Sequence, residues 1–506
     1  MNHWIVVPVV LPAVLAAVLT LTMRHHPALQ RVFSLGGVAA LLAVAIGLMV
    51  QAATGTIDVY ELGNWPAPFG IVLVLDRLSA LMVLLTAVLA GLVLLYAIGT
   101  GWDQRGNNFH PLYQFQLMGI FGAFLTGDAF NLFVFFEVLL IASYGLMIHA
   151  GGRRRLKAGV QYVIYNLLGS TLFLFALGTL YAVTGTLNMA DLAQRAAEIP
   201  AEDSALLRVG AMLLFLVFAI KAAVLPLHFW LPETYANAPA PVAALFAIMT
   251  KVGAYAILRM YTLVFGPDLG ATADLIDQML LYAALITLAV GMIGILGSKG
   301  LGRLAAFATI GSLGTLLIAI AGFREETTAA AIYYMLHSTL AGALLFIVVD
   351  LVRERRGTDA LVPGPVMAQH GLITSLFFGA AIAAAGMPPL SGFIGKLLIL
   401  DAVQEMDAVW LIWAVVLGTS LVAILGFAQA GSAVFWKPAP ADDSAQAAPN
   451  GADQPPVALP MVAACAMLAA IIALSVFAGP VMRYVEATAA QLHGPDTYIA
   501  AVLGTR

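Results

Sequence analysis

Residues 218–226 read FAIKAAVLP, an apolar segment that contains one lysine and ends at a proline. The apolar run begins near residue 206, and its length of about 20 residues is enough for an α-helix to cross the hydrocarbon core of a bilayer. Because proline lacks the backbone N–H donor, we expect the helix to break beside Lys221. A broken apolar helix with an internal charge indicates an all-α integral membrane protein that moves ions.

Apolar runs of similar length follow one another along the whole chain. The chain is 62% hydrophobic and 10% charged, whereas soluble domains contain about 25% charged residues. The first run lacks a basic leader and reads as a spanning helix. Hydropathy predicts about fourteen membrane-spanning helices, at 4–23, 33–52, 71–99, 112–128, 130–149, 158–184, 206–226, 240–264, 275–297, 301–322, 328–351, 371–400, 409–435 and 457–479.

Basic residues gather in alternate connections between these runs, which is the pattern of cytoplasmic loops. The opposite connections contain mostly acids. Both termini are therefore expected outside. The basic residues are Arg24, Arg31, Arg105, Arg153, Arg154, Arg155, Lys157, Lys299, Arg303, Arg353, Arg355, Arg356 and Lys437.

Several classes of chemistry are excluded by missing motifs. The single cysteine, Cys465, rules out disulfides and cysteine clusters within the chain. The sequence has no phosphate-binding loop, no dinucleotide fingerprint and no histidine pair at metal-ligand spacing within a helix. The net charge of -4 and the lack of a basic patch with aromatics argue against nucleic acid as a partner. We expect neither a cofactor nor a metal.

Ionisable side chains occur inside the predicted spans, where they are costly and therefore indicate function. They are Glu137, Lys221, Lys251 and Lys396, with His337 between the two lysine-bearing halves. Burial favours the neutral amine of a lysine, so that it exchanges a proton near neutral pH, and a nearby carboxylate opposes this effect. The set predicts a proton relay in which no covalent chemistry takes place.

A second break is expected at residues 387–392, MPPLSG, just before Lys396. Two broken spans in corresponding positions favour an inverted-repeat transporter. His228 and Glu233, beyond the first break, are candidates for a cytoplasmic entrance.

Other polar residues have simpler interpretations. Tyr162, Tyr165, Asn166 and Ser170 form a polar stripe that is typical of helix packing. Arg259 reads as an interfacial anchor, and Asp76 and Arg77 as side chains that pair or reach water at an interface.

Three segments resemble the antiporter-like subunits shared by respiratory complex I and Mrp-type cation/proton antiporters. They are FAIKAAVLPLHFWLPETYANAPAPVAAL at 218–245, FEVLLIASY at 136–144 and GMPPLSGFIGK at 386–396. A fourth segment, GNWPAPFGIVLVLDRLSALM at 63–82, is most similar to the D subunits of Mrp (Mnh or Pha) Na+/H+ antiporters. The resemblance covers nearly the whole chain. Some complex I relatives carry glutamate where this chain has Lys396.

The resemblance implies two inverted five-helix repeats and a glutamate, Glu137, paired with Lys221. It also implies that Lys251 and Lys396 continue the proton path. The expected location is the bacterial plasma (inner) membrane, and the expected partners are the A, B, C, E, F and G subunits of one Mrp complex. The implied division is helices one to three at 1–111, a first repeat at 112–264, a second repeat at 275–435, a flexible cytoplasmic linker at 436–456, and the last helix with its tail at 457–506.

The expected function is proton conduction coupled to the movement of sodium or another monovalent cation, by a secondary transporter subunit and not by an enzyme. The alternative is a redox-driven proton-pumping subunit of complex I or of a membrane hydrogenase, which would be a translocase subunit. A third interpretation is a purely structural assembly subunit.

Overall fold

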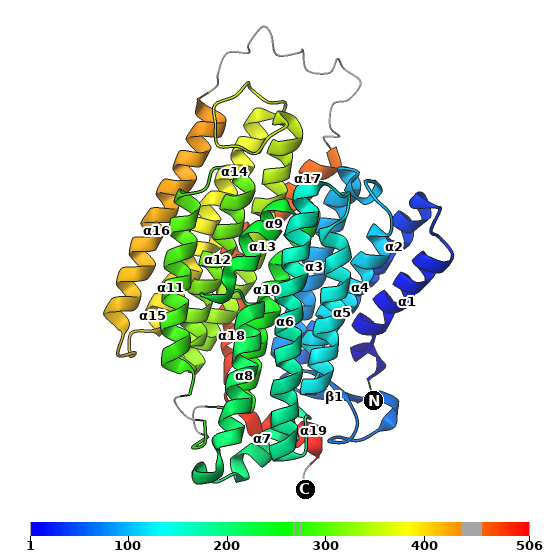
Figure 1. Cartoon of the computed structure of the whole chain (residues 1–506), viewed down its shortest axis with the longest axis vertical. Helices are drawn as coiled ribbons and strands as arrows, with labels where there is room; N and C mark the ends of the chain where they lie inside the picture. The colour runs from blue at the N-terminus through cyan, green and yellow to red at the C-terminus, as the bar shows by residue number, and fades with distance from the viewer. Residues whose placement is uncertain (1, 267–268, 273–274, 438–457, 505–506) are drawn as a thin grey trace.

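The computed structural model describes all residues except 1, 267–268, 273–274, 438–457 and 505–506. The helices run mostly along the long axis of the molecule, and both ends of the chain lie at the same end of the bundle (Figure 1). The helices are α1 (Val7–Leu21), α2 (Pro27–Ala52), α3 (Arg77–Gly99), α4 (Phe109–Leu125), α5 (Ala129–Met147), α6 (Arg153–Thr184), α7 (Met189–Glu198), α8 (Ala205–Lys221), α9 (Trp230–Asn237), α10 (Ala240–Leu263), α11 (Asp277–Leu296), α12 (Leu301–Ile320), α13 (Glu325–Arg356), α14 (His370–Ala385), α15 (Ser391–Ala402), α16 (Val409–Gly431), α17 (Ala458–Val476), α18 (Ala478–Leu492) and α19 (Pro495–Leu503). The strands are β1 (Asp58–Glu61) and β2 (Val72–Leu75).

The all-α membrane fold is confirmed. Within the described residues, 10 helices are long and apolar enough to cross a membrane, and α1 and α14 are shorter apolar helices. The predicted total of about fourteen spans stays a prediction, because broken spans such as α8 and α14 are too short to meet a length criterion by themselves.

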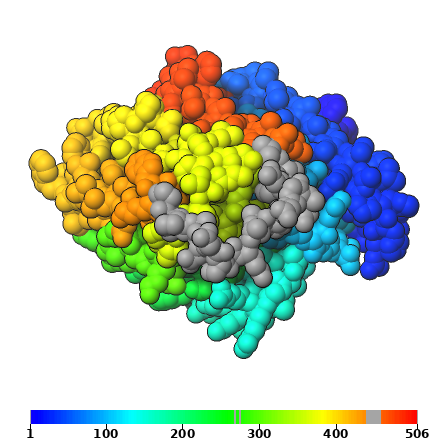
Figure 2. All heavy atoms as spheres, turned by 90° about the horizontal axis from the view of Figure 1, so that it is seen from above, coloured from blue at the N-terminus to red at the C-terminus, as the bar shows by residue number. Residues whose placement is uncertain are grey.

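Two helices form the centre of the bundle. Every residue of α10 is buried, and so is α13 from Thr327 to Val352. The two helices pack on each other, and α13 also contacts α12, α14, α15, α17 and α18. Seen along the bundle axis, the N-terminal helices lie at one edge and the segment just beyond residue 400 at the opposite edge (Figure 2).

The predicted boundary of the third span was wrong. The span was placed at 71–99, but Val72–Leu75 is a strand that pairs antiparallel with Asp58–Glu61. Asp76 then caps α3, which starts at Arg77. The run of β-branched and apolar residues before Asp76 has strand propensity, which an average of hydropathy does not register.

The C-terminal part also differs from the prediction. The span predicted at 457–479 corresponds to α17, but the tail predicted after it contains two further helices, α18 and α19. A further helix, α7, lies in the connection that was expected to be a loop between spans six and seven. Of the linker predicted at 436–456, residues 438–456 lie outside the described residues.

Both predicted helix breaks are confirmed. α8 ends at Lys221, a short 3-10 turn follows at Leu227–Phe229, and α9 begins at Trp230. α14 ends at Ala385, and α15 begins at Ser391. Each break contains a proline in a cis peptide bond, at Leu225–Pro226 and at Pro388–Pro389. The backbone between the half-helices leaves carbonyl groups free to accept hydrogen bonds from side chains.

Candidate functional site

Lys221 is the last residue of α8 and is 5% exposed. Its Nζ donates to the side-chain Oδ1 of Asn166 at 3.2 Å and to the backbone oxygen of the same residue at 3.4 Å. Asn166 lies on α6, which packs against α8. The amine at the break is therefore held by one residue of the neighbouring helix.

Glu137 of α5 is partly buried and is connected to Lys221 through α6. The hydroxyl of Ser170 donates to Glu137 Oε1 and also contacts the backbone oxygen of Asn166 at 3.1 Å. Within the described part of the chain, no ion pair joins Glu137 to Lys221 directly. The expected glutamate–lysine pair is thus two side chains linked by Ser170 and Asn166.

Lys251 lies on α10, close to the same break. It is 1% exposed, and its Nζ has no hydrogen-bond partner among the described residues. Two residues further on, Gly253 faces the end of α8, where an added Cβ would lie 2.7 Å from the amide nitrogen of Ala222. A residue without a side chain is required for this close approach, which sets Lys251 and Lys221 on adjoining helices.

His337 lies on α13 and is 1% exposed. Its Nδ1 is 2.9 Å from the hydroxyl of Ser391, the first residue of α15. The ring also lies against the next residue, Gly392, where an added Cβ would be 2.8 Å from Nε2 of the histidine. The histidine therefore contacts the second helix break and has a ring nitrogen that can take part in proton exchange.

Lys396 lies on α15 and reaches back across the second break. Its Nζ donates to the backbone oxygen of Ala385, the last residue of α14, at 2.8 Å. It also donates to the hydroxyl of Ser420 on α16 at 2.7 Å. The backbone oxygen of Ala385 at the second break thus accepts from Lys396, as Asn166 accepts from Lys221.

The two candidate entrance residues are in different surroundings. Glu233 of α9 is exposed, pairs with Arg303 at 3.4 Å, and lines a cavity of about 660 Å³ at the end of the bundle where α6 begins. His228 is 7% exposed, and its Nδ1 has no hydrogen-bond partner in the described part of the chain. It is not one of the residues that line this cavity. Of the two candidates, Glu233 is the one that lines this cavity.

Asn166 and Ser170 had been interpreted from the sequence as packing residues. Their spacing of four residues puts them on one face of α6, and that face is the one that joins Glu137 to Lys221. The sequence signal was present, but it did not identify the partners. The hydroxyls of Ser391 and Ser420, which contact His337 and Lys396, had no signal beyond their residue type.

No group of three or more His, Cys, Asp or Glu side chains that could hold a metal ion occurs among the described residues. The site instead consists of amines, one carboxylate, one imidazole and hydroxyls. These groups exchange protons without covalent chemistry.

Comparison with known proteins shows which family the chain resembles. Residues 126–422 match the family model described as NADH:quinone oxidoreductase/Mrp antiporter, TM. The chain is 38% identical to the D subunit of a probable K(+)/H(+) antiporter of Rhizobium meliloti, over 99% of this chain and 98% of that protein. It is 37% identical to the D subunit of a Na(+)/H(+) antiporter of Alkalihalophilus pseudofirmus, over 99% of this chain and 100% of that protein.

A solved structure is similar over the full length. The match is to a chain in the structure of the Mrp complex from Dietzia sp. DQ12-45-1b, with a TM-score of 0.89, 28% identity and 100% of both chains covered. The resemblance that the motifs carried is confirmed by these matches. The chain belongs to the NADH:quinone oxidoreductase/Mrp antiporter family of membrane proteins, on the branch of the antiporter D subunits.

Proposed function

We propose that the chain is the proton-conducting membrane subunit of a multisubunit monovalent cation/proton antiporter. The observation that supports this most strongly is the set of three buried lysines, two of them at helix breaks, with a carboxylate connected to the first. The full-length similarity to proteins named as antiporter D subunits supports the same function. The names of these relatives include both Na(+)/H(+) and K(+)/H(+) antiporters, so the transported cation is sodium or potassium.

The proposed path starts at the first break and ends at the second. Lys221 is the central proton carrier, Lys251 and His337 lie between the halves, and Lys396 is the terminal carrier. Among the described residues no direct hydrogen bond joins Lys221 to Lys251, Lys251 to His337 or His337 to Lys396. Proton transfer over these three steps uses a water molecule or a side-chain rotation.

Glu137 sets the protonation of Lys221 in this proposal. A carboxylate stabilises a nearby ammonium, and the low-dielectric interior makes the effect stronger than in water. Movement of Glu137 toward or away from Ser170 therefore loads or unloads the lysine. Ser170 and Asn166 transmit the change because they lie between the two charges.

We further propose that the chain works within a complex in the bacterial plasma membrane. Its partners are the other Mrp subunits, and the two inverted repeats surround the break at Lys221 and the break at Lys396. The cytoplasmic end is the one where Arg153, Arg154, Arg155, Arg303 and Arg353 line a single cavity. Basic residues favour the cytoplasmic side, so both termini, which lie at the other end, face outward (Figure 1).

The experiment that tests the function replaces Lys221 and measures cation-induced pH change in everted membrane vesicles with the complete complex. Lys221→Ala and Lys221→Met are both expected to abolish exchange, because neither side chain carries a proton. Co-purification of the partner subunits with each variant shows that assembly is intact.

The matched control is Lys157→Met, an exposed lysine near the start of α6, which should exchange like the wild type. Exchange at the wild-type level in Lys221→Met would instead identify the chain as an assembly subunit. A complex that ignores cations but pumps protons when NADH or hydrogen is oxidised would belong to the redox-driven branch of the family.

A further inference from the structure

A polar ladder leads from Lys251 toward the outer end of α10. Lys251, Tyr255 and Arg259 are spaced by four residues, so they share one face of the helix. Eight residues of helix separate the Cα atoms of Lys251 and Arg259 by about 12 Å. The Tyr255 hydroxyl donates to the backbone oxygen of Phe124 at 2.8 Å, and Arg259 Nε and Nη2 each donate to that hydroxyl at 3.4 Å.

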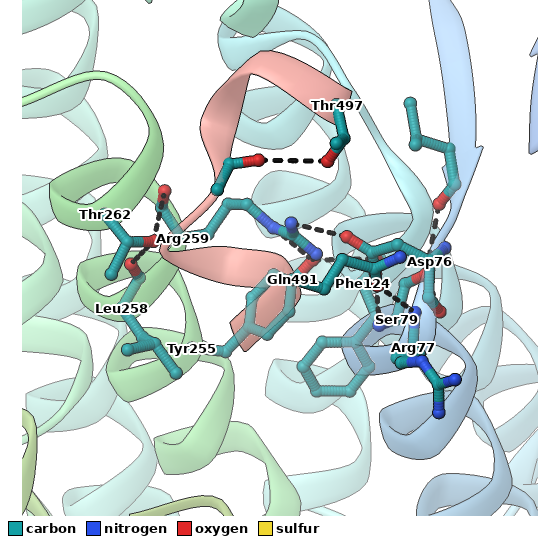
Figure 3. Close-up of polar contacts among 12 residues, drawn as sticks. Asp76, Arg77, Ser79, Phe124, Tyr255, Leu258, Arg259, Thr262, Gln491 and Thr497 are labelled. Carbon is teal, nitrogen blue, oxygen red and sulfur yellow. Dashed lines mark hydrogen bonds and ion pairs between the residues drawn. The ribbon is translucent and has the colours of Figure 1, made fainter. Parts of the chain in front are cut away.

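The ladder ends in a buried ion pair, as Figure 3 shows. Arg259 Nη1 lies 2.6 Å from Asp76 Oδ2, and the two side chains are 6% and 2% exposed. Asp76 is fixed in turn, because Oδ1 accepts from the backbone N–H of Ser79 at 2.8 Å. The interpretation of Arg259 as an interfacial anchor was therefore wrong: the arginine is buried and pairs with Asp76.

The C-terminal segment covers this pair. In Figure 3 the part of the chain that carries Gln491 and Thr497 arches over Asp76 and Arg259. The Tyr498 ring centre lies 5.5 Å from the guanidinium carbon of Arg259. The cavity between these groups measures about 10 Å³, which is about the volume that one water molecule needs. This volume does not hold a chain of waters.

We propose that the Asp76–Arg259 pair closes the outer end of the Lys251 pathway to protons. The inference rests on the proposed role of Lys251 as a proton carrier. An arginine cannot give up its proton in a protein, so it does not relay, and arginines in narrow pores exclude protons and cations. The Tyr255 hydroxyl donates its proton to Phe124 and accepts from both Nε and Nη2 of Arg259, so its one donor and two acceptor positions are used and none is free toward Lys251.

The consequence concerns the coupling of the two ion movements. If Lys251 exchanged protons with the outside directly, protons would cross the membrane without passing His337 and Lys396. The Asp76–Arg259 pair prevents this uncoupled proton leak. A buried ion pair is weak evidence for stability. Closure of the pathway therefore explains the Asp76–Arg259 pair better than stabilisation of the fold does.

The test replaces both charges together, so that neither is left buried alone. In Asp76→Asn/Arg259→Gln the asparagine still caps α3, while water gains the space of the guanidinium. Everted vesicles with the full complex are energised by respiration without sodium or potassium, and respiration is then stopped. The pH gradient is expected to decay several-fold faster than in wild-type vesicles. Adding Lys251→Met should restore the slow decay.

Two results would overturn the proposal: decay at the wild-type rate in the double variant, or fast decay that Lys251→Met does not slow. The matched control is Arg208→Met, an exposed arginine in the first turn of α8, which should leave the decay unchanged. If the double variant does not assemble, Arg259→Lys keeps a cation beside Asp76 but can release its proton. Vesicles with Arg259→Lys should leak protons through Lys251, and a pH gradient that decays at the wild-type rate would count against the proposal.

This measurement is separate from the test of the proposed function. Passive decay is recorded without the transported cation, whereas exchange requires it. Suppose that the double variant leaks protons through Lys251 but the complex shows no cation-induced exchange. The proposed antiporter function would then be wrong, and the proposed closure by Asp76 and Arg259 would stand. If exchange is normal, Lys221→Met abolishes it and the double variant does not leak, the antiporter function stands and the proposed closure is wrong.

Discussion

At the scale of single residues, the three buried lysines differ in how their amines are satisfied. Lys221 donates to Asn166, and Lys396 donates to Ala385 and Ser420. Lys251 Nζ has no such partner in the described part of the chain. A charged amine without a partner is far more costly to bury than a neutral one, so Lys251 is suited to hold a proton only in passing.

This difference gives a prediction for Lys251. Arginine keeps the positive charge but cannot release its proton, so Lys251→Arg should abolish exchange as completely as Lys251→Met does. The measurement is cation-induced pH change in everted vesicles, with the amount of assembled complex as reference. Exchange that survives in the arginine variant would mean that position 251 needs a charge and not a transferable proton.

Ser170 provides a second prediction. Its hydroxyl connects Glu137 to the residue that holds Lys221, and a hydrogen bond to a charged group contributes about 1.5 kcal/mol or more. Ser170→Ala should slow exchange roughly tenfold. The control is the next residue, because the hydroxyl of Thr171 donates to Leu167 of its own helix and to no other group among the described residues. If Thr171→Val slows exchange as much, the effect belongs to α6 and not to the link.

The sequence was sufficient to select Glu137 and the three lysines, because a charge within an apolar run stands out in any hydropathy profile. It was not sufficient for Asn166 and Ser170. A polar residue on a spanning helix packs against some neighbour in every membrane protein, and only the fold identifies that neighbour. The pairing of Asp76 with Arg259 was hidden for the same reason, since 183 positions separate them along the chain.

At the scale of elements, the two helix breaks are the feature that distinguishes this bundle from a simple array of spans. At the second break Lys396 donates to the backbone oxygen of Ala385, whereas Lys221 at the first break donates to Asn166 of the neighbouring helix. Prolines made both breaks predictable. The hairpin of β1 and β2 and the amphipathic helix α7 were not predicted, because a hydropathy search for spans has no criterion for short surface elements.

The second break depends on Gly386. It ends α14 with φ of +75°, and an added Cβ would lie 2.7 Å from Cδ of Lys396. Alanine in this backbone conformation costs about 1–2 kcal/mol, so Gly386→Ala should displace the lysine and lower exchange. Gly371 of the same helix has no atom within 4 Å of an added Cβ, and Gly371→Ala should exchange normally. Equal exchange in both variants would mean that Lys396 does not need its present position.

Asp359 connects the start of α12 to the end of α13. Burial alone would raise the pKa of this carboxyl, but attraction to Arg353 at 2.9 Å and the backbone N–H of Gly302 bring the pKa below its ordinary value. A lowered pKa in the folded state stabilises the fold above the ordinary carboxyl range, and that stability is lost as pH falls through the lowered value.

Thermal unfolding of the detergent-purified complex tests how much the ionised Asp359 carboxylate stabilises the fold. The wild type should lose stability below about pH 4, and Asp359→Asn should have a weaker pH dependence in that range. A variant with the full wild-type pH dependence would show that other carboxyls cause the loss.

At the scale of the whole molecule, the central pair α10 and α13 carries Lys251 and His337, and the helix breaks with Lys221 and Lys396 lie against this pair. The membrane class could be predicted from composition, since a bilayer admits only helices or closed barrels. The packing of the two halves against each other could not be predicted from composition, because it depends on which helices contact one another. The two inverted repeats remain a prediction.

The most direct test of the central claim is cation-induced pH change in everted vesicles that contain the complete complex, with Glu137→Gln measured beside the wild type. We predict that sodium or potassium collapses the respiration-generated pH gradient in the wild type and fails to do so in the assembled variant. Exchange at the wild-type rate in Glu137→Gln would contradict the account. So would a wild-type complex that does not respond to cations and pumps protons only when NADH or hydrogen is oxidised.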